Sequence, residues 1–230
     1  MLAGIDLLYE QVEISQTDAA VITTDLTTYT FSGMELGAAH SNRKIVVHVV
    51  MSDGSAGTTI STLTIGGISA AVVSDGVTNA SADGAGASTS LSAQWMAAVP
   101  TGTTGDIVVT FSAESNNCAI TVYRLINAAT TAFHVATDIT ADGSNAVSAS
   151  LNIPGFGVAI GSVRWQGNGA TRTTTWDGLT ENVDETIEAT STYSSASKYF
   201  ATGQSGLTIT ATASGTLDLE ALVLASFRPL

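Results

Sequence analysis

Alternation of apolar and polar residues is the dominant pattern along this chain. In the run 106–111, Ile107, Val109 and Phe111 share one side of an extended chain, with polar or smaller residues between them. Such alternation predicts a half-buried β-strand. Similar runs recur between clusters of turn residues, whereas the spacing typical of helices is scarce. We therefore predict an all-β protein without helices, built as an antiparallel β-sandwich of the jelly-roll or immunoglobulin-like type.

Turn-forming dipeptides separate these runs. Gly66-Gly67 lies between the apolar runs 62–65 and 68–73, which together predict a hairpin. Asp-Gly dipeptides tolerate positive φ and predict further tight turns. Four of them begin at Asp53, Asp75, Asp83 and Asp142.

The series of predicted strands occurs twice. In the first half, the strands lie at 45–51, 62–73, 91–97, 106–111 and 119–125. In the second half, the matching segments lie at 156–161, 173–178, 199–201, 206–211 and 221–227. Leu207, Ile209 and Ala211 repeat the inward positions of Ile107, Val109 and Phe111. We predict an N-terminal arm at 1–23 followed by two tandem, related halves at 24–126 and 127–230.

Composition and charge exclude several classes of protein. Hydrophobic residues make up 44% of the chain and charged residues 12%, so the chain is globular rather than disordered. The 7 basic and 20 acidic residues give a net charge of -13, which repels nucleic acid. No apolar run reaches the roughly 20 residues that span a membrane. The single cysteine forms neither an internal disulfide nor a paired-thiolate metal site, and we predict no metal and no cofactor.

Candidate catalytic residues are few. The three histidines, His40, His48 and His134, accompany no G-x-S-x-G motif, so no nucleophile and base are indicated. The internal repeat equates His48 with Ala159, so the fold itself does not require the imidazole. We therefore predict a protein without enzymatic activity.

An acidic segment and a polar loop offer weaker alternatives. Glu181 or Asp184 could pair with Glu188 in a glycan hydrolase, although alternation along a strand favours a solvated edge. The loop at 75–86 carries oxygen ligands, but their spacing misses the calcium-loop pattern. We interpret that loop as an exposed connection between strands.

Aromatic residues and the N-terminal arm are candidate binding elements. Trp165, Trp176 and Tyr193 are candidate contacts for a glycan ring. The arm is a candidate strand that joins the sheet of a neighbouring protein. Its attachment residues are Ile5, Leu7, Leu8, Tyr9, Val12 and Ile14.

The segments 63–73, 97–111 and 117–125 resemble β-rich structural proteins of tailed bacteriophages and phage-like particles, and so do 206–213 and 222–227. The resemblance covers the chain from about residue 40 onward, in pattern and phrasing rather than in a catalytic signature. It implies a virion protein of the head decoration, head spike or tail-fibre type.

The resemblance also implies the partners. They are other virion proteins of the capsid, spike or tail. Separately, apolar segments such as 132–136 favour self-association, and a trimer is the homo-oligomer expected of a spike. The first residues lack a secretory signal, so we expect synthesis in the host cytoplasm before assembly into the virion. Two alternatives stay open: a carbohydrate-binding receptor module of a tail fibre that contacts a host-surface glycan, and the glycan hydrolase.

Overall fold

The structure is a computed structural model, and it describes residues 10–53, 57–80, 89–139, 144–166, 172–188, 191–215 and 219–230. Within these ranges every regular element is a β-strand, which confirms the all-β prediction. This part of the chain contains no helix that is long and apolar enough to cross a membrane.

The first half of the chain forms a sandwich of two antiparallel sheets. Its strands are β1 (Glu13–Ile22), β2 (Leu26–Glu35), β3 (Arg43–Asp53), β4 (Ile60–Ile65), β5 (Ile68–Ser69), β6 (Ala71–Ala80), β7 (Thr89–Ala98), β8 (Thr104–Ser115) and β9 (Asn117–Ile126). The order is β1-β9-β3-β7-β6 in one sheet and β2-β8-β4-β5 in the other. Apolar side chains from both sheets, including Tyr29, Val47 and Val109, fill the core between them.

The second half forms a sandwich of the same kind. Its strands are β10 (His134–Asp138), β11 (Ala146–Ile153), β12 (Gly157–Gln166), β13 (Thr174–Asp177), β14 (Thr180–Glu188), β15 (Ser191–Phe200), β16 (Gln204–Ala213) and β17 (Leu219–Phe227). The order is β10-β17-β12-β15-β14 in one sheet and β11-β16-β13 in the other. Its core contains Trp165, Ile209 and Leu222.

The two halves share one strand order, which confirms the predicted duplication. The strands β1, β9, β3, β7 and β6 correspond one by one to β10, β17, β12, β15 and β14. The outer strands β2, β8 and β4 correspond in the same way to β11, β16 and β13. The predicted inward positions also hold, because Val109 faces the first core and Ile209 faces the second.

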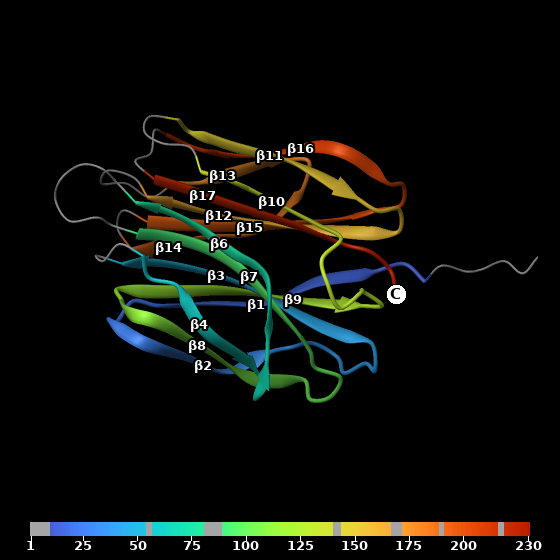
Figure 1. The fold of residues 1–230 in the computed structure, drawn as a ribbon, viewed down its shortest axis with the longest axis horizontal. Coiled ribbons are helices and arrows are strands. Elements are labelled where there is room, and N and C mark those ends of the chain that lie inside the picture. Colours follow the sequence, from blue (N-terminus) through green and yellow to red (C-terminus); the bar gives the residue numbers. More distant parts are fainter. Residues whose placement is uncertain are drawn as a thin grey trace, which may run out of the picture.

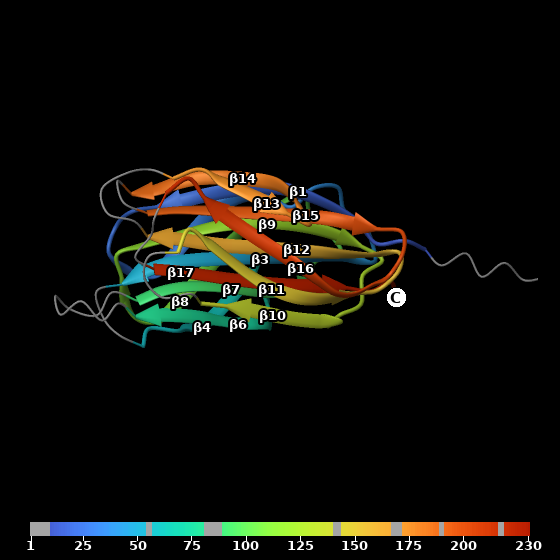
Figure 2. The same ribbon diagram turned by 90° about the horizontal axis from the view of Figure 1, so that it is seen from above.

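The sandwiches pack back to back and make a stack of four sheets (Figure 1). The five-stranded sheets lie in the middle, and the sheets that contain β8 and β16 lie on the outside (Figure 1). Seen from above, most strands of the body run along its long axis (Figure 2). Val46, Met96 and Tyr123 of the first half meet Ile160 and Phe227 of the second in the central contact. The chain therefore has three apolar layers, one inside each sandwich and one between them.

Of the predicted turns, one is confirmed and one is wrong. The Gly66-Gly67 hairpin is confirmed, because Ile65 pairs with Ile68 and both glycines have positive φ. The turn expected at Asp75 is wrong, since Asp75-Gly76 lies inside β6, where the register with β7 shifts between Ser74 and Val77. A strand tolerates such an extra residue as a β-bulge. The turns expected at Asp83 and Asp142 lie outside the described residues.

One end of the stack gathers both described ends of the chain, and we call it the terminal end. It comprises residues 10–13, 126–131, 154–157 and 227–230. Backbone hydrogen bonds hold these segments together, from the Val12 amide to the Phe156 carbonyl at 2.9 Å and from the Leu230 amide to the Asn127 carbonyl at 2.9 Å. The strands run from this end to the opposite end of the body (Figure 1).

Candidate functional site

Polar and ionisable side chains gather in two places. One is the buried layer between the two middle sheets, and the other is a pocket at the terminal end.

The pairing registers correct one predicted equivalence. His48 faces the layer between the sandwiches, where its ring approaches the second half, whereas Ala159 faces the second core. Their side chains therefore lie on opposite faces of corresponding strands. The matched segments 119–125 and 221–227 put Thr121 at the position of Val223. His48 pairs with Thr121 and Ser162 pairs with Val223, so His48 corresponds to Ser162.

Contacts around His48 indicate a two-fold relation between the halves. His48 Nε2 lies 3.1 Å from Ser92 Oγ, which lies 3.5 Å from Ser162 Oγ. The His48 ring also contacts the Tyr193 ring, with centroids 6.3 Å apart. The registers match Ser92 to Tyr193 and His48 to Ser162. The contact between Ser92 and Ser162 is therefore the equivalent, in the internal repeat, of the contact between Tyr193 and His48. The packing therefore resembles an isologous dimer interface joined within one chain.

The imidazole of His48 is neutral in this environment. It is fully buried, and burial lowers its pKa to about 3. Its Nδ1 has no hydrogen-bond partner among the described residues. A neutral ring closed in between two sheets has no access to an external substrate, so its contacts serve the packing.

Further hydrogen bonds join the two sandwiches through this layer. Tyr123 Oη donates to Asn182 Oδ1 at 3.1 Å, and Ser195 Oγ donates to Thr121 Oγ1 at 3.3 Å. Each bond pairs one residue of the first half with one of the second. Buried hydrogen bonds have defined partners, so they fix how the sandwiches sit against each other.

A buried arginine orders the loops near the terminal end. Arg43 Nε donates to the Val99 carbonyl at 2.6 Å, and Nη1 donates to the Gly37 carbonyl at 2.6 Å. Its Nη2 donates to the carbonyls of Thr101 and Gly102 at 2.7 and 2.8 Å. Burial lowers the pKa of this guanidinium. The Arg43 guanidinium thus supplies hydrogen bonds to the backbone carbonyls of the loops around it and is not available to a ligand.

The acidic strand holds Asp184 and Glu188 in separate hydrogen-bonded positions. Asp184 accepts hydrogen bonds from the amide and hydroxyl of Thr174, both at 2.9 Å. Glu188 accepts one from Asn117 Nδ2 of the first sandwich at 2.8 Å. Burial, and secondly the charge of Asp184, raise the pKa of Glu181. Asp184 and Glu188 are thus held toward different partners, so the geometry does not place them across one glycosidic bond.

The predicted aromatic contacts lie mostly inside the protein. Trp165 and Tyr193 are fully buried, and Trp165 Nε1 donates to Thr174 Oγ1 at 2.9 Å. Trp176 is half-buried, and its Nε1 donates to Ser194 Oγ at 2.8 Å. A ring that stacks on a sugar needs an exposed face, which Trp165 and Tyr193 do not offer. Only Trp176 keeps part of its surface accessible.

The predicted attachment residues divide into two groups. Ile5, Leu7, Leu8 and Tyr9 lie outside the described residues. Val12 is buried between the sandwiches, and Ile14 pairs with Leu125 of β9. From Val12 onward the arm is therefore integrated into its own fold, with β1 as an edge strand of the first sandwich.

The described ranges contain neither a cluster of metal ligands nor a reactive thiol. These ranges hold no group of three His, Cys, Asp or Glu side chains that could bind a metal ion. Cys118 is buried, and burial raises the pKa of its thiol, which disfavours the reactive thiolate. Residues 81–86 of the polar loop lie outside the described ranges.

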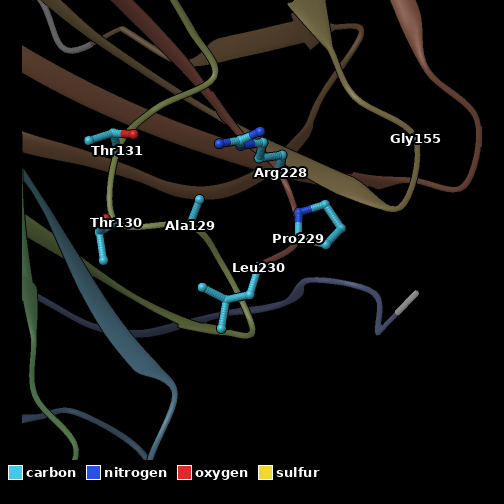
Figure 3. A pocket seen from close by; sticks show the side chains of 7 residues that line it. All are labelled: Ala129, Thr130, Thr131, Gly155, Arg228, Pro229 and Leu230. Carbon is cyan, nitrogen blue, oxygen red and sulfur yellow. The ribbon is translucent and has the colours of Figure 1, made fainter. Parts of the chain in front are cut away.

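The terminal end carries an open pocket of about 470 Å³ (Figure 3). Its lining residues are Ala129, Thr130, Thr131, Gly155, Arg228, Pro229 and Leu230. Threonines of the linker between the sandwiches form one side, and the segment 228–230 forms another (Figure 3). This lining offers apolar surface, hydroxyl groups and one exposed guanidinium, without a carboxylate or thiol side chain. The pocket therefore suits binding rather than acid–base or nucleophilic chemistry.

Exposed apolar side chains lie close to this pocket. Phe156 follows the lining residue Gly155 and is 45% exposed, and Leu230 is 65% exposed. Phe133 is 49% exposed and lines a separate hollow with Asn152 and Ile153. Exposed large apolar side chains are candidates for contact with another chain segment.

No protein-family model matches this chain, and no curated protein shows a significant match to its sequence.

Proposed function

We propose that this chain is a non-enzymatic virion structural protein, displayed on a phage particle as a capsid decoration, head spike or fibre, and attached at its terminal end. The observation that carries this proposal is the locking of two sandwiches into one body through a buried, hydrogen-bonded layer. Groups suited to chemistry have internal partners: His48 contacts Ser92 in that layer, and Asp184 accepts hydrogen bonds from Thr174 within the second sandwich. A rigid body of this kind suits a structural role on a particle surface better than catalytic turnover of a substrate.

Charge and geometry support the same role. A net charge of -13 favours solubility at the high local density of a particle surface. The pocket and the start of the described chain share the terminal end, which leaves the opposite end of the stack to face outward (Figure 1). Weak contacts at the terminal end gain strength when many copies, or the copies of a trimer, engage together.

The attachment test deletes residues 1–9, which precede the buried Val12 and the first strand. We expect the truncated chain to fold but to be lost from purified particles, as measured by quantitative mass spectrometry. The matched control replaces the same nine residues by a Gly/Ser segment of equal length. Incorporation of the truncated chain at the level of the intact chain would contradict attachment through the arm.

The two alternative functions have less support. A carbohydrate-binding module would have to rely on Trp176, since Trp165 and Tyr193 are buried. A hydrolase would have to reorganise Asp184 and Glu188 away from their present partners. A saturable change of tryptophan fluorescence with host-surface polysaccharide would favour the first, and new reducing ends would favour the second.

A further inference from the structure

The chain enters the body directly beside the pocket of the terminal end. The Val12 amide donates to the Phe156 carbonyl at 2.9 Å, and the residue before Phe156 lines the pocket. Glu10 and Gln11, which precede this anchor, are exposed. The segment 1–9 is therefore tethered within a few residues of the pocket mouth.

The tethered segment has the composition of a buried element. It contains five large apolar or aromatic residues after Met1, together with one carboxylate at Asp6. They are Leu2, Ile5, Leu7, Leu8 and Tyr9. Apolar surface of this extent is favoured to leave water wherever a complementary surface lies within reach. An extended chain advances about 3.3 Å per residue, so Leu7 can lie anywhere within roughly 17 Å of Val12.

The pocket offers the complementary surface. Ala129, Pro229 and the exposed Leu230 provide apolar contacts. Arg228 places an exposed guanidinium in the lining, opposite in charge to Asp6. The chain has only 7 Lys and Arg residues. Asp6 therefore has few basic partners other than Arg228.

We propose that the terminal-end pocket is the docking site of the chain's own N-terminal segment, residues 1–9, with Leu7 and Leu8 against the apolar lining and Asp6 near Arg228. A short tether keeps the segment at an effective concentration in the millimolar range, which favours its own pocket over that of a second copy. The inference does not require the virion role. If that role holds, the free protein stores its attachment arm in this pocket.

A pair of engineered cysteines tests this docking in the full-length chain. Leu7→Cys is combined with Thr131→Cys in the exposed part of the pocket wall, and the rate of disulfide formation is followed on non-reducing gels. The native Cys118 is buried and does not compete. The control combines Leu7→Cys with Thr24→Cys, which is exposed at the opposite end of β1 and beyond the reach of the tether.

We expect a rapid intramolecular disulfide in the pocket pair, at a rate independent of protein concentration, and none at this rate in the control. Adding Leu8→Asp or Arg228→Glu, both at sites that leave the described core intact, should slow it by about tenfold. Equal rates in the two pairs, disulfide-linked dimers, or insensitivity to both added substitutions would overturn the proposal. Because purified protein is used without particles, such a failure leaves the attachment test independent.

Discussion

At the residue scale, the polar side chains of the central layer are most informative. His48 faces Ser92 of its own half and Tyr193 of the other, and its partners there are neutral groups. Burial alone lowers the pKa of His48. The imidazole therefore stabilises the packing only in its uncharged form.

This arrangement predicts a loss of stability in acid. The folded-state pKa of His48 is about 3, below the ordinary value of 6.5, so the unfolded chain binds a proton that the folded chain excludes. The stabilisation is complete above pH 6.5 and is lost as the pH falls toward 3. At pH 4.5 the loss amounts to about 3 kcal/mol.

Urea unfolding at pH 7 and pH 4.5 measures this loss. His48→Gln keeps a polar side chain of similar size but does not titrate, so it should show a smaller acid loss by about the same 3 kcal/mol. The same acid dependence in both proteins would contradict the account of the layer.

At the element scale, much of the strand arrangement could be predicted from the sequence. Alternation identified the strands around Val109 and Ile209, and Gly66-Gly67 marked the hairpin. Alternation does not determine which residue of one strand corresponds to which residue of its repeat once the two sequences have diverged. The predicted equivalence of His48 and Ala159 is wrong for this reason. It also does not distinguish a turn from a bulge at Asp75, because the same dipeptide fits both.

The first strand supplies the prediction at this scale. Deletion of residues 1–20 removes Val12 from the central contact and most of β1 from its pairing with β9, whereas deletion of 1–9 removes neither. We expect the longer deletion to lower the free energy of unfolding by on the order of 5 kcal/mol relative to the shorter one. Denaturant midpoints measure the difference. Equal stability of the two truncated chains would show that β1 is dispensable to the fold.

At the scale of the whole molecule, the duplication produces an internal two-fold arrangement. The sequence indicated two related halves but contained no signal for their packing, since the faces that meet carry Ser, Thr and His as well as apolar residues. The terminal-end pocket was equally hidden. It forms because the linker after β9 meets residues 228–230, about a hundred positions away in the chain, through the Ala128–Pro229 bridge.

The back-to-back packing is the central claim, and a disulfide across the layer tests it most directly. Ser92 and Ser162 belong to different halves, and their hydroxyl oxygens lie 3.5 Å apart. In the Ser92→Cys/Ser162→Cys variant, folding under oxidising conditions should give one disulfide within each chain, between β7 and β12, identified by peptide mass spectrometry. Recovery of both engineered thiols in reduced form from the folded protein would contradict the back-to-back packing.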